Sequence, residues 1–598
     1  MAQPEQSAPG RPAARSTAEH IKETLESIVV AFVLAFVFRA FIVEAFVIPT
    51  GSMAVTLYGD QVTNTCSTCG FEYARGMEVG AAEAARAGRI HSIRLRCPNC
   101  DTTFDELRPA QIAATDSGDR ILVHKWPFDV GGELLGPHRW DVTVFKDPRD
   151  GTTNFIKRLV GLPGEVLEII DGDIYTARLD DLKKANFPVD EFDRLRLEVY
   201  ALRGRSDGQN GRAIVERYAA LNRQLLAHLK IQRKLDDAPR AQESLWFNVY
   251  NHDFLPDYSN SAGGEPADRV RWKPDGPLSA AAWDTSRREV TFRSTSEEPL
   301  FVKFSGKPID DFTAYNHEQM NGSSRRLVGD LRLAFTWLPG SSTGGLLLEM
   351  NRDEDVFTAE INADGTISVT ARQPGIPAGQ RTLGTAKLEP FTAPVQIEFI
   401  NVDFRVLLNI SGQTVIRSRD EYAPDVVRLV AREEKNRAPK PSEVRIGARK
   451  TECELRHLVL QRDVYYRDAH QLETSNERPD MSPAERAAIE LNPFHQWPGW
   501  GTTGMPILLR TERVVDGRKL PGEYFMLGDN SAASKVSRLW WEIGEHLKGL
   551  GPEYQVGTVT GDQLLGEAFF VYWPAGYRPA WAGGIGLVPN VGRMRWIR

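Results

Sequence analysis

The apolar residues are densest near the start of the chain. From Ile28 to Phe38 every residue is apolar, and the apolar character continues to Ile48 with only two charged intrusions. This stretch predicts a transmembrane anchor over residues 21–45, in which Arg39 reaches back to the membrane interface. The uninterrupted run is shorter than the roughly 20 residues of a usual membrane helix. A removable signal peptide or a buried core helix therefore stays open as an alternative.

Elsewhere apolar and polar positions alternate, which predicts β-strands. The alternation is clear from Trp140 to Phe145 and from Phe155 to Val160. We therefore expect a mainly β fold. Residues 46–60, 116–178 and 511–598, from both ends of the chain, are expected to form one β-rich domain, called here the body.

Two residues of this body are candidates for chemistry. Ser52 follows a β-like run that breaks at Pro49, and it lies in a turn beside Gly51. Lys157 precedes Arg158 in a strand, and neighbours in a strand point to opposite faces, so one of these two cations must face apolar side chains. A desolvated lysine can lose its proton and act as a base, whereas arginine keeps its charge. A common Gly-Ser turn and a lysine that snorkels to the surface would give the same pattern.

The stretch between the two parts of the body is far too long for a loop and must be folded. Residues 179–240 carry apolar side chains at helical spacing, which predicts a helical hairpin. Residues 241–470 change to short alternating runs separated by turn signals, which predicts an antiparallel β-sandwich. Residues 471–510 are expected to be a linker. Residues 1–20 have too few large apolar side chains to fold and are expected to be a disordered tail.

Four of the five cysteines form two Cys-x-x-Cys pairs. This spacing predicts a zinc-ribbon-like insert over residues 61–115, with the candidate ligands Cys66, Cys69, Cys97 and Cys100. Two disulfide bridges between the same thiols stay open as the alternative if the segment lies in an oxidising compartment. The fifth cysteine, Cys453, lies in a strand-like stretch and is expected to be a small buried hydrophobe.

Composition narrows the class of protein. The chain has 598 residues, with 73 basic and 80 acidic side chains and a formal net charge of −7. No long basic stretch could neutralise a row of phosphates, which argues against nucleic acid as a partner. The length requires several cores, about three or four domains.

Four segments together resemble the signature boxes of the type I signal peptidases, also called leader peptidases, the serine/lysine-dyad protease family S26. They occur in the family's order and read Ile48-Pro-Thr-Gly-Ser-Met53, Gly118-Asp-Arg-Ile-Leu-Val123, Ile156-Lys-Arg-Leu-Val-Gly-Leu-Pro-Gly-Glu165 and Leu527-Gly-Asp-Asn-Ser-Ala-Ala-Ser534. The resemblance implies a membrane-bound serine endopeptidase that cleaves signal peptides from exported preproteins after small residues of the Ala-x-Ala type.

The same resemblance implies roles for individual residues. Ser52 would be the nucleophile, Lys157 the general base, and Ser534 the hydroxyl that orients the lysine amine. Thr50 and the amide of Ser52 would form the oxyanion hole. Catalysis would need no cofactor, and zinc would be structural. The family's topology implies one pass through the plasma or inner membrane, with the tail in the cytoplasm and the catalytic body on the extracytoplasmic side.

The sequence departs from the family's pattern at two positions. Val55 stands where the family usually has a proline, and Val536 stands where it usually has an aspartate. In the family that aspartate pairs with the arginine that corresponds to Arg538, so Asp529 becomes a candidate partner here. Loss of the usual pair is expected to loosen the loop that carries Ser534.

Two other functions compete with this one. The first is a catalytically impaired, membrane-anchored binding protein whose sandwich holds a glycan, a protein or another cell-envelope ligand. The sandwich vaguely resembles concanavalin-like and laminin-G-like jelly rolls, and Trp246, Trp272 and Trp283 could either stack on sugars or fill the core. The second is a self-cleaving repressor of the SOS-response type, which also uses a serine and a lysine. That protein requires a DNA-binding domain, and the sequence shows no sign of one.

Overall fold

The computed structural model describes most of the chain. The described residues are 17–130, 132–201, 208–257, 271–316, 325–340, 343–374, 379–420, 422–435, 437–467, 500–534, 536–540, 544–548, 550, 554–576 and 590–597. Most of the predicted tail (1–20) and of the predicted linker (471–510) lies outside them.

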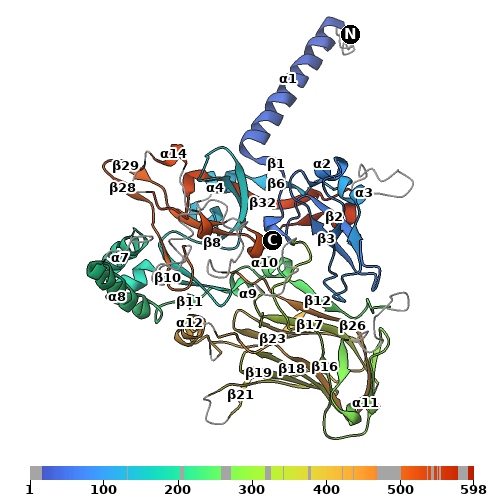
Figure 1. Ribbon diagram of the computed structural model, residues 1–598. Coiled ribbons are helices and arrows are strands. Elements are labelled where there is room, and N and C mark those ends of the chain that lie inside the picture. Colours follow the sequence, from blue (N-terminus) through green and yellow to red (C-terminus); the bar gives the residue numbers. More distant parts are fainter. Residues whose placement is uncertain are drawn as a thin grey trace, which may run out of the picture.

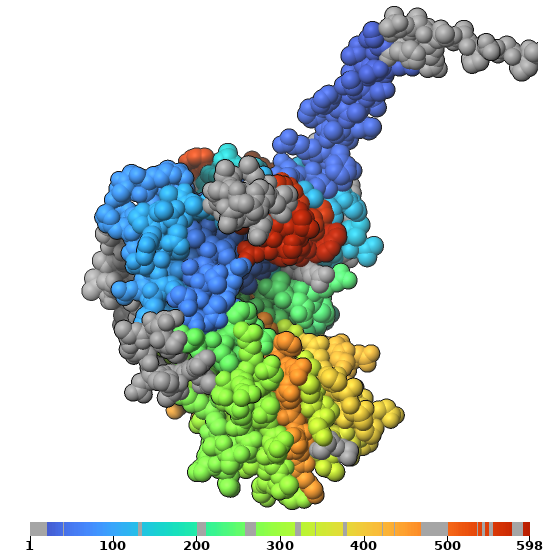
Figure 2. All heavy atoms as spheres, turned by 90° about the vertical axis from the view of Figure 1, so that its right-hand side faces the viewer, coloured from blue at the N-terminus to red at the C-terminus, as the bar shows by residue number. Residues whose placement is uncertain are grey.

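The first element is a long helix, α1 (Thr17–Phe41), which stands out from the rest of the molecule (Figures 1 and 2). Its large apolar side chains are exposed, for example Phe32 at 60% and Phe36 at 66%, so the alternative of a buried core helix is wrong. Among the described residues, none of the helices combines the length and the apolarity that crossing a membrane requires. A transmembrane anchor over residues 21–45 therefore stays a prediction.

The body is built from strands of both chain ends, and the prediction of a mainly β fold is confirmed. Its larger sheet has the order β1-β6-β32-β7-β8-β30-β31, with β33 beside β32. The strands are β1 (Val43–Val47), β6 (Arg120–His124), β7 (Val142–Lys146), β8 (Asn154–Gly161), β30 (Glu523–Leu527), β31 (Val559–Thr560), β32 (Leu564–Trp573) and β33 (Arg595–Trp596). Because β8 pairs with both β7 and β30, the strand that carries Lys157 lies inside the sheet.

A second sheet of the body has the order β11-β10-β9-β27. It consists of β9 (Glu165–Ile170), β10 (Asp173–Arg178), β11 (Lys230–Ile231) and β27 (Ile507–Leu509), and β28 (Arg513–Val515) and β29 (Arg518–Leu520) form a separate hairpin. Short helices complete the body: η1 (Gly51–Met53), α4 (Trp126–Val130), α5 (Gly132–Leu135), η7 (Ser531–Ala533), η8 (Ser537–Leu539), α14 (Glu545–Lys548), η10 (Gly561–Gln563) and η12 (Val591–Arg593).

Two helix-containing segments flank the body. The cysteine segment, residues 61–115, contains β2 (Gln61–Thr65), β3 (Glu72–Gly76), α2 (Ala81–Arg86), β4 (Ile93–Arg94), β5 (Glu106–Leu107) and α3 (Pro109–Ala113). On the other side lie α7 (Val189–Ala201) and α8 (Gly208–Leu225), which are packed together and follow α6 (Leu179–Lys184) in the chain (Figure 1). The short helices α9 (Lys234–Asp237) and α10 (Pro239–Ser244) lie near the middle of the view, between the body and the insert.

Residues 247–462 form two antiparallel sheets, called here the insert. One has the order β14-β15-β26-β17-β22-β23-β24, with β12 beside β26, and the other has the order β13-β16-β25-β18-β19-β20-β21. The first contains β12 (Phe247–Asn251), β14 (Trp283–Asp284), β15 (Val290–Ser294), β17 (Leu331–Pro339), β22 (Val395–Val402), β23 (Arg405–Ile410), β24 (Gln413–Arg417) and β26 (Thr451–Arg462). The second contains β13 (Trp272–Pro274), β16 (Leu300–Phe304), β18 (Gly345–Arg352), β19 (Asp355–Asn362), β20 (Thr366–Arg372), β21 (Arg381–Lys387) and β25 (Val444–Arg449), and the helices are α11 (Pro277–Ala282) and α12 (Val426–Glu434).

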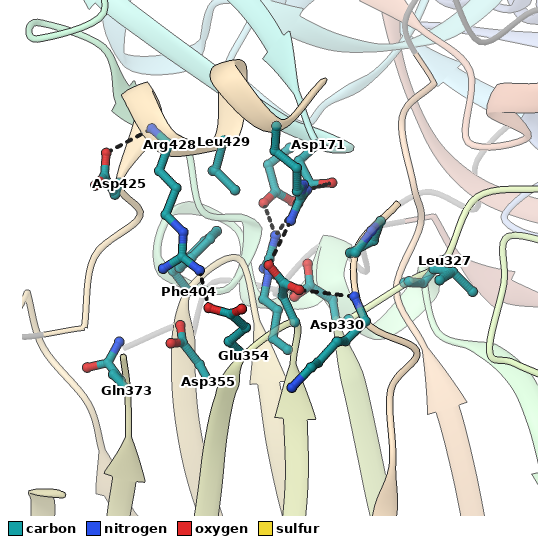
Figure 3. Close-up of a pocket in the computed structure, with 18 of the residues that line it drawn as sticks. Asp171, Leu327, Asp330, Glu354, Asp355, Gln373, Phe404, Asp425, Arg428 and Leu429 are labelled. Carbon is teal, nitrogen blue, oxygen red and sulfur yellow. Dashed lines mark hydrogen bonds and ion pairs between the residues drawn. The ribbon is translucent and has the colours of Figure 1, made fainter. Parts of the chain in front are cut away.

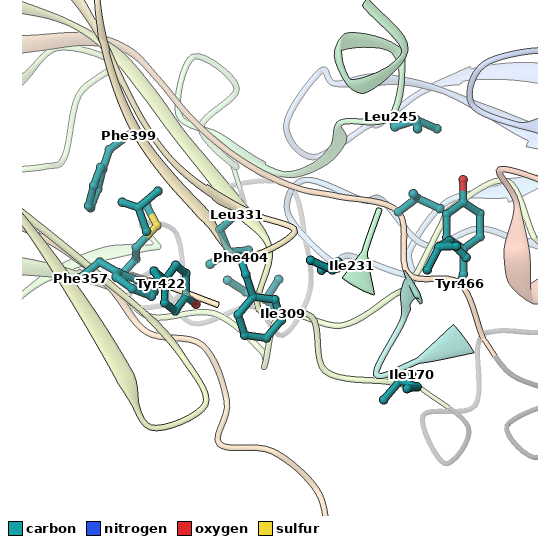
Figure 4. Packing of buried hydrophobic residues seen from close by; sticks show 14 of the residues in the cluster. Ile170, Ile231, Leu245, Ile309, Leu331, Phe357, Phe399, Phe404, Tyr422 and Tyr466 are labelled. Carbon is teal, nitrogen blue, oxygen red and sulfur yellow. The ribbon is translucent and has the colours of Figure 1, made fainter. Parts of the chain in front are cut away.

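The insert and the body share one apolar core. Ile170 of β9 and Ile231 of β11 belong to the same buried cluster as Leu331, Phe357 and Phe399 of the insert (Figure 4). Burial of apolar surface contributes about 25 cal/mol per Å². The insert is therefore packed onto the body and is not a loosely tethered appendage.

The buried side chains also settle the role of the tryptophans. Trp272, Trp283 and Trp246 are only 0%, 4% and 8% exposed. Of the two alternatives left open by the sequence, packing of these rings in the core is confirmed, and stacking on sugars is wrong. Cys453 is 4% exposed in β26, which confirms a buried small hydrophobe.

Candidate active site

Ser52 lies in the short helix η1, at the end of the chain segment that follows β1. Just after β1, the amide of Ile48 donates to the carbonyl of Asp119 at 2.9 Å, which brings this segment beside the residue before β6. A Cβ atom added at Gly118 would lie 1.8 Å from the carbonyl oxygen of Ile48, so only glycine allows this approach. Gly118 and the carbonyl of Asp119, both in the second box, thereby hold the start of the nucleophile turn, which we define as residues 49–53. Within this turn Ser52 is 8% exposed.

Lys157 meets Ser52 from the inner strand β8. Its Nζ atom lies 2.6 Å from Ser52 Oγ and 2.9 Å from the carbonyl oxygen of Ile156. The lysine is 4% exposed. Both cations of the strand are buried, because Arg158 on the opposite face is also inaccessible.

The environment of Lys157 favours its neutral form. Burial lowers the pKa of this amine to about 7, although the negative charges of Asp529 and Asp147 act in the opposite direction. A neutral amine at hydrogen-bond distance from a hydroxyl can remove its proton, which is the requirement for a serine nucleophile. The two groups that the sequence proposed as nucleophile and base are therefore brought together by the fold.

Ser534 lies against the same turn. It is 4% exposed, and its Oγ has no hydrogen-bond partner among the described residues. A Cβ atom at Gly528 would lie 2.1 Å from Ser534 Oγ and 2.5 Å from the carbonyl oxygen of Ser52. Glycine at this position thus allows the Ser534 loop to approach the nucleophile. The hydroxyl is unsatisfied in the interior and is free to bond a nearby group, but no bond to Lys157 is formed here.

Thr50 is the residue at which the structure is least informative. It precedes η1 and is exposed, and its side chain makes no capping bond to the helix. Its role in an oxyanion hole stays a prediction.

A buried ion pair behind the site was not foreseen from the sequence. Arg158 Nε and Nη2 donate to the two oxygens of Asp529, each at 2.7 Å, and both side chains are completely buried. Thr56 Oγ1 donates to the same carboxylate at 2.6 Å. The predicted use of Asp529 by Arg538 is therefore replaced by a pair with Arg158, while Arg538 donates to the carbonyl of Ser531 at 2.7 Å.

The four cysteines of the cysteine segment converge as predicted from their spacing. Their sulfur atoms lie within 4.8 Å of one another, and all four side chains are buried. The Cys66–Cys100 and Cys69–Cys97 sulfur pairs are each 3.6 Å apart, and no disulfide is formed. A zinc ion at about 2.3 Å from each corner of a sulfur tetrahedron requires separations of about 3.8 Å, so this donor set fits zinc.

A second group of potential metal ligands consists of three carboxylates whose charges are balanced by neighbouring basic side chains. Asp173, Asp330 and Asp403 come within 4.8 Å of one another, beside a cavity of about 230 Å³ (Figure 3). Arg352 contacts Asp173 at 2.7 Å and Asp330 at 2.5 Å, and Lys234 contacts Asp403 at 2.8 Å. Because side-chain cations occupy the places between these carboxylates, the cluster joins body and insert electrostatically and does not require a metal ion.

The comparisons with known proteins match part of the β-rich body to one protease family. Residues 110–190 match the family described as "Signal peptidase, peptidase S26". This match includes β8 with Lys157, whereas Ser52 and Ser534 lie outside it.

Two relatives illustrate the similarity. Signal peptidase I of Rickettsia typhi is 26% identical over 160 residues, which are 27% of this chain and 44% of the relative. Signal peptidase I of Pseudomonas fluorescens is 42% identical over 60 residues, which are 9% of this chain and 21% of the relative. The matched segment thus spans less than half the length of these relatives. At the level of the family, the matches support a type I signal peptidase.

Among solved structures, the laminarinase catalytic domain from Thermotoga maritima aligns with 36% of this chain and 98% of its own, at 10% identity and a TM-score of 0.24. This likeness is too low to bear on the function of the insert.

Proposed function

We propose that the protein is a signal peptidase I, a serine endopeptidase that uses Ser52 as nucleophile and Lys157 as general base. The observation that carries the proposal is the 2.6 Å contact between Ser52 Oγ and a lysine amine whose pKa is lowered to about 7. A serine hydroxyl is a weak nucleophile and needs an adjacent base of this kind.

The reaction then proceeds in two steps. Lys157 takes the proton of Ser52 while the hydroxyl oxygen attacks the scissile carbonyl, and the protonated lysine returns this proton to the leaving amine. Water then hydrolyses the acyl-enzyme, again with Lys157 as base. The amide of Ser52 and Thr50 would stabilise the oxyanion, which is worth about 3 kcal/mol for each donor. Ser534, whose buried hydroxyl has no partner among the described residues, would hold the lysine amine during the proton transfers.

The proposed substrates are exported preproteins with small residues before the cleavage site. Helix α1 would hold the enzyme at the membrane through its exposed apolar side chains, with the body on the extracytoplasmic side. In this arrangement the nucleophile turn begins only a few residues after the end of α1 and β1. The site would therefore lie close to the membrane surface, where a signal peptide leaves the bilayer.

A direct test uses the purified full chain and a preprotein with an Ala-x-Ala site. We expect one cut after the second alanine, identified by the mass of the two products. A preprotein in which both alanines are replaced by bulky residues should stay intact. The proposal fails if the first preprotein is not cut under conditions in which another signal peptidase cuts it.

The rate of cleavage should depend on pH through Lys157. The neutral amine is the active form, and its pKa is lowered to about 7. We therefore expect kcat/KM to rise about tenfold per pH unit below this midpoint and to level off above it. The measurement is kcat/KM between pH 5 and 9 at constant ionic strength.

Two neighbouring charges provide matched variants for this pH profile. Asp147 raises the pKa of Lys157 and Arg149 lowers it. Asp147→Asn should therefore move the midpoint to lower pH, and Arg149→Met should move it to higher pH. If the pH midpoint of kcat/KM is the same in both variants as in wild type, a group other than Lys157 controls the rate.

We also propose that Cys66, Cys69, Cys97 and Cys100 bind a structural zinc ion. The purified protein should contain about one zinc ion per chain, and a strong chelator should release it, expose reactive thiols and lower the melting temperature. Cys97→Ser should reproduce this loss, whereas Cys453→Ser should keep the metal because Cys453 lies in the insert. Two disulfides and no metal in the purified protein would refute the zinc site.

A further inference from the structure

The insert reaches the nucleophile turn through one short segment, residues 309–316. We propose that Asn316 in this segment is a positioning residue for Ser52, which it holds in place through Asn530. The inference rests on the proposed function and adds to it a part of the insert that the reaction requires. It means that the insert is a component of the active site and not an independent module.

Asn316 and Asn530 form a closed pair of amide hydrogen bonds. Asn316 Nδ2 donates to Asn530 Oδ1 at 2.7 Å, and Asn530 Nδ2 donates to Asn316 Oδ1 at 2.6 Å. Asn316 is 9% exposed and Asn530 is 3% exposed. Water therefore has little access to either amide and cannot readily replace a missing partner.

Asn530 holds the nucleophile turn at two points. Its Nδ2 donates to the carbonyl of Gly51 at 2.9 Å, and its backbone amide donates to the carbonyl of Ser52 at 3.1 Å. The Gly51 carbonyl belongs to the peptide group before Ser52, and the Ser52 carbonyl belongs to the peptide group after it. The position of Ser52 Oγ relative to Lys157 thus depends on where the Asn530 amide points.

The orientation of that amide is fixed by Asn316. Asn530 Nδ2 has two hydrogens, one for Gly51 and one for Asn316, and its Oδ1 accepts from Asn316. Without Asn316, the Oδ1 atom is left in the interior without this donor, at a cost typical of a buried unsatisfied group. The side-chain amide of Asn530 is then free to rotate, and such a rotation breaks the hydrogen bond from its Nδ2 to the Gly51 carbonyl.

Tyr315 fixes the segment that carries Asn316. Its carbonyl accepts from the amide of Gly76 at 3.0 Å and from Arg75 Nη1 at 2.6 Å, and its hydroxyl donates to the carbonyl of Asp60 at 3.2 Å. A Cβ atom added at Gly51 would lie 1.8 Å from the ring of Tyr315. Glycine before the nucleophile therefore lets the insert come this close, which explains the glycine of the first box.

A second connection runs to the same loop from Arg467, which follows the last strand of the insert. The amide of Arg467 donates to Ser531 Oγ at 2.8 Å, and its side chain contacts Asp311 at 2.5 Å. Asp311 precedes Asn316 in the same segment, and Ser531 follows Asn530. Arg467 thus links the segment that carries Asn316 to the residue after Asn530, which further fixes the relative position of the two asparagine side chains.

The test is to measure kcat, KM and the rate of Ser52 phosphonylation by a small serine-reactive phosphonate in three variants of the full chain. Asn316→Ala should lower kcat by roughly 10- to 100-fold, as expected for a misplaced reacting group. Phosphonylation should fall in parallel, while KM should change less than about twofold, because Asn316 acts through Asn530 on the position of the reacting group. The pH midpoint of about 7 should not move, because Lys157 keeps its surroundings.

Two further variants keep the test decisive if alanine impairs folding. Asn316→Asp has the same size but cannot donate to Asn530 Oδ1 when ionised, and it should lose most of the rate. Glu433→Ala is the matched control: it removes insert contacts to the amide of Asp171 and to Thr503, away from the nucleophile turn. It should lower the melting temperature and leave kcat unchanged.

The outcomes separate the two proposals. If wild type cleaves and is labelled by the phosphonate while the folded Asn316 variants keep its kcat, Asn316 has no positioning role. If Asn316→Ala and Glu433→Ala lower kcat equally, general stability explains both and the inference is overturned. If wild type is neither labelled nor active, the proposed function itself fails.

Discussion

Replacement of Ser52 with alanine should abolish cleavage of the preprotein and labelling by the phosphonate. Lys157→Met should have the same effect, because its side chain has a similar length but no amine to accept the proton of Ser52. For residues that act as one unit, each single loss lowers kcat by about 10⁴-fold or more, and the double variant is hardly worse than either single one. Single-turnover cleavage by wild type, both single variants and the double variant provides the measurement.

Folding provides the control for this experiment. The pKa of Lys157 is about 7 in the folded protein and near 10.5 in an unfolded chain, so between these values the folded state binds fewer protons. The stability of wild type should consequently increase as pH rises from about 7 to about 10.5, by about 4 kcal/mol in total. Lys157→Met should lack this increase and should be no less stable than wild type at pH 7. Cleavage by well-folded Ser52→Ala or Lys157→Met would contradict the mechanism.

The second large effect concerns stability. Arg158 and Asp529 form a completely buried pair that links β8 to the loop after β30. Asp529→Asn leaves the guanidinium without its counter-ion in the interior, which should lower the free energy of unfolding by about 3–5 kcal/mol. Thr56 Oγ1 loses its charged acceptor at the same time. Urea unfolding at pH 7 measures the loss.

A double variant distinguishes the pair from other causes. Arg158→Met with Asp529→Leu removes both charges and fills a similar volume, so it should be more stable than Asp529→Asn alone. If the double variant is as unstable as the sum of its single variants, the two side chains do not act as a pair. A matched surface pair, Lys519 with Glu512 at 3.0 Å, should contribute less than about 1 kcal/mol when broken.

The strands of the body followed from local sequence patterns, whereas the pairing of Ser52 with Lys157 followed only from the resemblance to the type I signal peptidases. Alternation placed Lys157 in a strand, and the first box placed Ser52 in a turn. The pattern could not say which of Lys157 and Arg158 faces the interior, because both have apolar neighbours at alternate positions. The structure buries both, Lys157 against Ser52 and Arg158 in an ion pair with Asp529, and these partners come from other parts of the chain.

Other features had no local signal at all. Arg158 and Asp529 are 371 positions apart, and Asn316 lies in a segment that no motif distinguishes. Their roles depend on which surfaces the insert and the body bring together. The tryptophans show the reverse case: their type is compatible with sugar binding, but burial is a property of the finished core. Composition does not specify it.

The pairing of β8 with β30 also has a consequence for biosynthesis. Ribosomes add about 5–20 residues per second, so roughly 20–70 s separate the emergence of Arg158 from that of Asp529. Throughout this interval the nascent polypeptide already carries Ser52 and Lys157, but the edge of β8 that pairs with β30 in the folded protein is still unpaired. Under the proposed function, the active site would thus be completed only near the end of translation, long after the segments that carry Ser52 and Lys157 have been made.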